Sequence, residues 1–159
     1  MMEIIDTLRW IHVIGATVLF GTGSGIAFFM LMAHRTRDPH VIAHVAGTVV
    51  TADLVFTTTA VIIQPATGAL LALEIGWSLS EGWIVVSLLL YVLTGLFWLP
   101  VVWIQLRLRD VAQRASLSGE RLPDEYDALF RIWFACGIPA FSAVLTILWL
   151  MIAKPRIML

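Results

Sequence analysis

The chain has 159 residues, of which 60% are hydrophobic and 13% are charged, and its mean hydropathy is +0.92. Soluble domains carry roughly 25% charged residues, so this chain lacks the polar side chains that a water-facing surface needs, and a lipid bilayer is its expected partner. The net charge of −1 gives no basic surface for a nucleic acid. A single cysteine, Cys136, excludes an intramolecular disulfide and a Cys-x-x-Cys metal or redox site.

Four apolar segments follow one another, at about residues 8–33, 41–73, 83–104 and 132–153, and the helices that contain them are predicted over about residues 8–33, 41–73, 83–115 and 124–153. Each is long enough to cross the hydrocarbon layer, which takes about 20 helical residues. Short connections favour antiparallel neighbours, with Asp38-Pro39 and Ser118-Gly119 marking two of the turns. We therefore expect an all-α membrane protein whose single domain, residues 1–159, is a four-transmembrane-helix antiparallel bundle.

Positive residues are distributed unevenly over the connections. The first and third carry seven arginines, namely Arg35, Arg37, Arg107, Arg109, Arg114, Arg121 and Arg131. Only Arg9, Lys154 and Arg156 fall on the other side. Because positive loops stay in the cytoplasm, both termini are predicted on the non-cytoplasmic side of a bacterial inner (cytoplasmic) membrane. Four tryptophans near predicted helix ends are typical of interface anchors: Trp10, Trp83, Trp133 and Trp149.

The second segment carries polar residues on one face. In a regular helix a single direction is shared by Asp53, Thr57, Ala60, Gln64 and Thr67. Asp53 is the only acidic residue well inside an apolar segment, where a carboxylate is costly. Pro65 removes a backbone donor and frees a carbonyl one turn earlier. The stripe predicts either a lining for a cofactor, substrate or ion path, or interhelical hydrogen bonds that hold the bundle together.

Polar residues of all four segments are expected to meet in the non-cytoplasmic half of the bundle. Antiparallel packing places seven residues around one shared cavity there: His12, Gln64, Thr67, Ser87, Tyr91, Thr146 and Trp149. The opposite side of the first segment carries a Gly21-x-x-x-Gly25 motif. Such a motif allows close helix contact, either within one chain or between the two chains of a homodimer.

Histidine is a common ligand of haem iron, zinc and copper, and the chain has four. His12 lies inside the first segment, where it is either a haem ligand or a buried imidazole bonded to a threonine or glutamine. The other three, His34, His40 and His44, are expected at the cytoplasmic mouth. There they either bind a metal ion or face headgroups and water.

Two motifs carry a family resemblance. Leu8-Arg9-Trp10-Ile11-His12-Val13-Ile14-Gly15, followed by a glycine-rich stretch and by His34, resembles the first helix of HemJ-type protoporphyrinogen oxidases and their CopD-like copper-resistance relatives. Gln64-Pro65-Ala66-Thr67-Gly68 is similar to the stretch that ends their second helix. The chain is more similar still to a bacterial group described as predicted integral membrane proteins of unknown function. The resemblance covers four helices in length and order, and two in motif.

The resemblance implies a small redox-associated membrane protein that binds haem b. His12 is the expected axial ligand of the iron, and His34 is a second candidate metal ligand. Gln64, Thr67, Tyr91 and Trp149 are the expected neighbours of the cofactor. The family's histidine or basic ligand on the third helix has no counterpart, because residues 83–105 contain no histidine or lysine.

Two other functions stay open at this point. A small-solute or proton transport component would use Asp53 and Gln64, with Thr57 on the same face, near the middle of the membrane. A non-catalytic accessory subunit of a larger redox complex would use the polar stripes for packing only. Whether the protein is an enzyme does not follow from the sequence.

Overall fold

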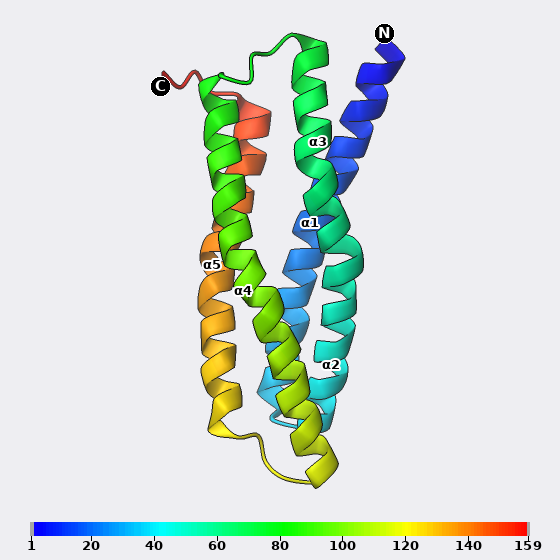
Figure 1. Cartoon of the computed structure of the whole chain (residues 1–159), viewed down its shortest axis with the longest axis vertical. Helices are drawn as coiled ribbons and strands as arrows, with labels where there is room; N and C mark the ends of the chain where they lie inside the picture. The colour runs from blue at the N-terminus through cyan, green and yellow to red at the C-terminus, as the bar shows by residue number, and fades with distance from the viewer. Residues whose placement is uncertain (1, 159) are drawn as a thin grey trace.

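The computed structural model describes residues 2–158, which form long helices joined by short connections (Figure 1). The elements in chain order are α1 (Met2–Thr36), α2 (Pro39–Ala52), the π-helical turn η1 (Asp53–Thr57), α3 (Thr58–Ile75), α4 (Gly82–Ser118) and α5 (Asp124–Ala153). Because α2, η1 and α3 are continuous, the chain makes four antiparallel rods. The α1–α2 and α4–α5 connections lie at one end, here the arginine end, and the α3–α4 connection lies at the other, here the terminal end.

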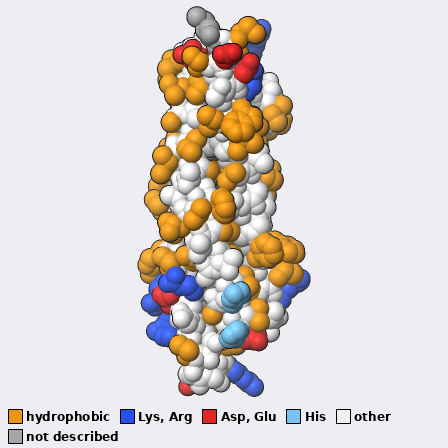
Figure 2. Space-filling model, turned by 90° about the vertical axis from the view of Figure 1, so that its right-hand side faces the viewer, with side chains coloured by type: hydrophobic (Ala, Val, Ile, Leu, Met, Phe, Trp, Pro, Cys, Tyr) orange, Lys and Arg blue, Asp and Glu red, His pale blue; other side chains and the backbone are white. Residues whose placement is uncertain are grey.

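Each rod has the length and composition of a membrane span, with 30 to 37 residues. Figure 2 shows charged side chains gathered at the two ends, with an uncharged and largely hydrophobic band between them. In that band Leu89 and Leu96 each leave 64% of their surface exposed, as lipid-facing side chains do. The predicted four-helix transmembrane bundle is confirmed, whereas the side of the membrane on which the termini lie stays a prediction.

Local chemistry explains where the helices begin and end. The Asp38 side chain accepts from the backbone N–H of His40 at 2.8 Å, and Pro39 occupies the first turn of α2. Gly76 and Gly119 end α3 and α4 in the left-handed conformation, with φ of 87° and 71°. The first helix begins earlier than expected because its first turns are polar, which hides them from a hydrophobicity criterion.

The tightest packing lies toward the arginine end. Five large side chains there are at most 1% exposed, namely Met30, Ile42, Leu108, Val111 and Tyr126. His34 stacks on the ring of Phe130 with 3.7 Å between centroids. Arg37 makes two hydrogen bonds to Asp127, of 2.5 and 2.8 Å, which tie the α1–α2 connection to the start of α5. The hydrogen bond to Asp127 raises the pKa of Arg37.

Toward the terminal end α3 diverges from α4 and α5 (Figure 1). A second, smaller cluster closes this end, with Ala72, Trp83, Ile84 and Leu150 buried in it. Between the two clusters the four rods enclose the cavity on which the functional argument depends.

Candidate functional site

A cavity of about 620 Å³ lies between α1, η1, α3, α4 and α5. Most of its wall is apolar, from side chains such as Leu19, Phe20, Leu99, Phe134 and Ile138. The end of the cavity that faces the arginine end is polar. On three of the rods, the lining residue nearest to the arginine end has a polar group, namely Asp53, Gln105 and Trp133.

Asp53 is the centre of a hydrogen-bonded chain at this polar end. The carboxylate is 4% exposed, and Trp98 Nε1 donates to its Oδ1 at 3.3 Å. With the Gln105 amide oriented to satisfy both of its groups, Nε2 donates to Asp53 Oδ2 at 3.3 Å and Oε1 accepts from Trp133 Nε1 at 3.2 Å. The chain Trp133–Gln105–Asp53–Trp98 thus joins α5, α4 and η1.

One polar group at this end has no partner. The hydroxyl of Thr57 lines the cavity, the residue is 6% exposed, and this oxygen makes no well-formed hydrogen bond among residues 2–158, although the Asp53 carboxylate is a nearby acceptor. A buried hydroxyl without a partner costs about 1–3 kcal/mol, so such groups are uncommon in folded proteins. Asp53 and Thr57 therefore combine a desolvated carboxylate with a hydroxyl that is free to bond a ligand.

The π-helical turn decides which way these residues face. The backbone N–H of Thr58 donates to the carbonyl of Asp53, five residues earlier, and the Thr58 hydroxyl lies 3.3 Å from the same oxygen. The turn accommodates one extra residue, which rotates α3 by about 100° from a regular continuation of α2. The single polar stripe expected from a regular helix is therefore split. Asp53 bonds side chains of α4, while Gln64 and Thr67 bond α1.

His12 belongs to the α1–α3 interface and is not a lining residue of the cavity. Its Nδ1 lies 2.9 Å from the Thr67 hydroxyl, and Gln64 Nε2 donates to its backbone carbonyl at 2.8 Å. Because the Thr67 hydroxyl donates to the Ile63 carbonyl at 2.8 Å, its oxygen accepts the hydrogen of Nδ1. This arrangement fits the Nδ1–H tautomer, in which the lone pair is on Nε2. Of the two expectations for His12, the structure contains the imidazole bonded to a threonine.

Tyr91 compensates for Pro65. Proline has no backbone N–H, so the carbonyl of Val61, four residues earlier, has no partner within α3. The Tyr91 hydroxyl of α4 donates to this carbonyl. Tyr91 and Gln64 are the two residues of the expected seven that line the cavity.

The other five residues do not line the cavity, so the prediction that all seven share it is wrong for them. Trp149 is 58% exposed and lies on the outer surface. Ser87 and Thr146 donate to carbonyls of their own helices, of Trp83 at 2.7 Å and of Ser142 at 2.9 Å. Hydroxyls satisfied in this way need no partner on another helix. His12 and Thr67 bond one another in the α1–α3 interface instead.

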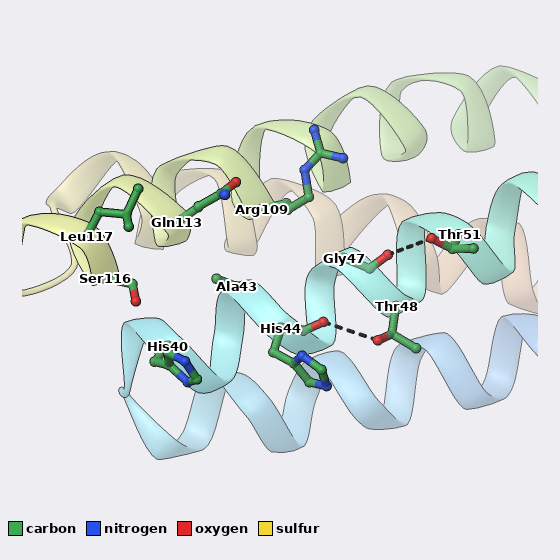
Figure 3. Close-up of a pocket in the computed structure, with 10 residues that line it drawn as sticks. All are labelled: His40, Ala43, His44, Gly47, Thr48, Thr51, Arg109, Gln113, Ser116 and Leu117. Carbon is green, nitrogen blue, oxygen red and sulfur yellow. Dashed lines mark hydrogen bonds between the residues drawn. The ribbon is translucent and has the colours of Figure 1, made fainter.

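The three histidines of the arginine end do not form one cluster. His34 stacks against α5, and its Nδ1 lies 3.4 Å from the Tyr126 hydroxyl. His40 and His44 instead line a groove between α2 and α4 (Figure 3). Within the described part of the chain, no three His, Cys, Asp or Glu residues are placed to hold a metal ion.

Sequence reasoning did not assign three residues of the polar end to the site: Trp98, Gln105 and Trp133. Trp133 was expected as an interface anchor, as was Trp83, but they are 5% and 7% exposed. Gln105 follows Trp98 by seven residues and so continues the polar face of α4. This seven-residue spacing could have indicated that Gln105 faces the site. Because Arg107 and Arg109 follow directly, Gln105 looked like part of the polar connection instead.

The Gly21-x-x-x-Gly25 motif makes no close contact within the chain. A Cβ built on Gly21 has nothing within 4 Å, and one on Gly25 meets only Phe29 of the same helix, at 4.0 Å. Tight packing inside one chain is therefore not its role, and a homodimer contact stays a prediction.

The cavity residues do not fit a haem. Among residues 2–158, no histidine, cysteine, methionine or lysine lines the cavity, and the hydroxyl of Tyr91 is bonded to the carbonyl of Val61. His12 Nε2 has a lone pair, but the ring packs over Gly68, where an added Cβ would lie 3.0 Å from Cε1. Haem ligation by His12, with or without His34, stays a prediction that the cavity does not support.

Comparison with known proteins gives one match. Residues 6–155 match the model of a family described as predicted integral membrane protein (DUF2269). No curated protein and no solved structure matches the chain. The predicted resemblance to such membrane proteins is confirmed, and the resemblance to HemJ-type oxidases and CopD-like proteins stays a prediction.

Proposed function

The chain belongs to the family of predicted integral membrane proteins (DUF2269), and from the geometry of its cavity we propose that it binds a lipid-soluble amphiphile within the membrane. The ligand's polar end donates a hydrogen bond to the Asp53 carboxylate and accepts one from the Thr57 hydroxyl, and its apolar body lies along α1, α4 and α5. The observation that carries this proposal is the unpartnered Thr57 hydroxyl beside a buried carboxylate.

The polar end favours a hydroxyl head group. Trp98 and Gln105 each donate to one oxygen of Asp53, and each oxygen retains a further lone pair. A hydroxyl can donate to the carboxylate and accept from Thr57, which satisfies both groups at once. Aromatic rings of Trp98 and Trp133 beside the carboxylate suit a flat or unsaturated group next to the head.

The position of the polar end supports the same orientation that a lipid adopts. Gln105 precedes Arg107 by two residues, a rise of about 3 Å along α4. The polar end of the cavity therefore lies on its arginine side, close to the first arginine of α4, and the apolar remainder extends from it toward the terminal end. A packed hydrophobic core lies between the cavity and the arginine end, so the cavity does not continue as an open path to that end. This favours binding of a ligand over passage of a solute.

Photocrosslinking of the full chain in lipid nanodiscs tests the proposal. The probe is a long-chain fatty alcohol with a diazirine, and the control probe is the matching hydrocarbon without the hydroxyl. We expect the alcohol to label cavity residues of α4 and α5. Thr57→Val and Asp53→Asn should each lower this labelling about tenfold, the loss expected for a charge-assisted hydrogen bond. Thr59→Val is the matched control, because Thr59 is exposed on the outer surface.

Stability separates lost binding from lost folding. Removing an unpartnered hydroxyl from a buried site is neutral or stabilising, so Thr57→Val should unfold at the same or a higher temperature. Equal labelling by the two probes, or equal labelling of Thr57→Val and Thr59→Val, would overturn the proposal.

The haem b prediction has its own test in the same preparation. An absorption spectrum before and after dithionite would have to contain a Soret band that His12→Ala removes. Transport of a proton or a small solute past Asp53 and Gln64 is the remaining alternative. It would be excluded if the Asp53→Asn variant, in proteoliposomes, gave the same proton or solute flux as the wild type.

A further inference from the structure

We propose that a second site, the groove between α2 and α4 at the arginine end, binds the phosphate group of an anionic membrane lipid. The groove has a volume of about 600 Å³ and is separate from the cavity at Asp53. Figure 3 shows the lining residues on these two neighbouring helices. Its polar lining comes from His40, His44 and Thr48 of α2 and from Arg109, Gln113 and Ser116 of α4.

The lining offers hydrogen-bond donors and no carboxylate. The imidazoles, the Ser116 hydroxyl, the Gln113 amide and the Arg109 guanidinium carry N–H or O–H donors, which is the chemistry that recognises a phosphate, whereas the Thr48 hydroxyl already donates to the His44 carbonyl at 3.2 Å. His40 and His44 are four residues apart and exposed on one face of α2. Arg109 and Gln113 have the same spacing on α4, so each wall carries a pair of polar side chains on one face of its helix.

Arg109 retains free donors for this purpose. Its Nε and Nη2 both donate to Asp110 Oδ1, at 2.9 and 2.8 Å, which leaves further N–H groups of the guanidinium uncommitted. Arg37 and Arg107 differ from it, because they pair with Asp127 and Glu125 of α5, away from the groove. Arg109 is the only arginine that lines the groove.

The depth of the groove suits a lipid headgroup. Figure 2 shows histidine and arginine side chains together where the uncharged band meets the arginine end. Phosphates of a bilayer lie at this level, and basic residues attract them there. The groove continues along α2 to Thr48 and Thr51, into the uncharged band, so an acyl chain attached to the phosphate has a path toward the hydrocarbon.

Native mass spectrometry of the full chain in detergent tests the site. The probes are phosphatidylglycerol and a diacylglycerol with the same acyl chains but no phosphate. We expect retention of phosphatidylglycerol and little retention of diacylglycerol. Arg109→Gln and His44→Ala should each weaken the retention about tenfold. Arg114→Gln removes an equal charge from an exposed position of α4 outside the groove and should leave the retention unchanged.

A binding measurement with inorganic phosphate distinguishes the two possible sources of the phosphate group, a lipid headgroup and the free anion. Binding of phosphate without lipid, lost in Arg109→Gln, would identify the free anion as sufficient, whereas binding of the lipid alone would identify the headgroup with its chains. Equal retention of the two lipids overturns the proposal, as does equal weakening by Arg109→Gln and Arg114→Gln. Pairing of two copies through this face would appear as a dimer that lipid does not dissociate, and it would also overturn the proposal.

Discussion

The imidazole Nδ1 of His12 and the hydroxyl oxygen of Thr67 lie 2.9 Å apart across the interface between α1 and α3. This pair links the two rods within an apolar surrounding, where few other polar contacts exist. We expect His12→Leu and Thr67→Val to be coupled in a double-mutant cycle by about 0.6 kcal/mol, the average for interhelical hydrogen bonds in membranes, and by no more than about 1.7 kcal/mol. Thermal unfolding in detergent, followed by the reactivity of the single thiol at Cys136, measures each variant. Additive effects would show that the contact contributes nothing to stability.

Gly15 provides a second test of the same interface. A Cβ at this position would overlap Gln64 Nε2, which would have to give up its bond to the His12 carbonyl. We expect Gly15→Ala to lower the free energy of unfolding by about 1 kcal/mol, even though alanine favours the helix. Gly21→Ala is the matched control, because its Cβ meets nothing within 4 Å. That variant should be as stable as the wild type or more so.

Tyr91 should be coupled to Pro65. Tyr91→Phe leaves the Val61 carbonyl without a donor and should cost about 1–2 kcal/mol of unfolding free energy. In a Pro65→Ala background the new backbone N–H can bond that carbonyl within the helix, so the same substitution should cost less. The cycle is measured by thermal unfolding of the four proteins. An equal cost in both backgrounds would mean that the hydroxyl acts on some other group.

Gln105 should be the most sensitive glutamine of α4. Gln105→Leu removes a donor from Asp53 and the acceptor of Trp133 Nε1, so we expect a loss of about 2 kcal/mol. Gln113→Leu changes the same chemical group at an exposed position of the same helix and should stay within about 0.5 kcal/mol of the wild type. The emission spectrum of Trp98 and Trp133 should also change in the first variant only.

Hydrophobicity alone was sufficient to predict the four rods, since each apolar segment became a helix of membrane-spanning length. The inward direction of Asp53 and Thr57 also followed from the cost of polar groups in lipid. The residues that make up the site could not be predicted from the sequence in the same way. The prediction of which residues share a helix face assumed a regular α-helix through residues 53–57, where the structure has a π-helical turn. It also treated Trp133 as an anchor, because proximity to a helix end does not distinguish a tryptophan at the membrane surface from one packed between helices.

The extra residue in η1 also makes the length of this segment informative across homologues. A homologue one residue shorter between Ala52 and Thr58 would have a regular helix there and could keep every α1–α3 partner in place. It would lose the geometry that presents both the carboxylate and the hydroxyl to the interior. A one-residue gap at this point in an alignment would therefore separate proteins that share only the architecture from those that also share the polar end of the cavity.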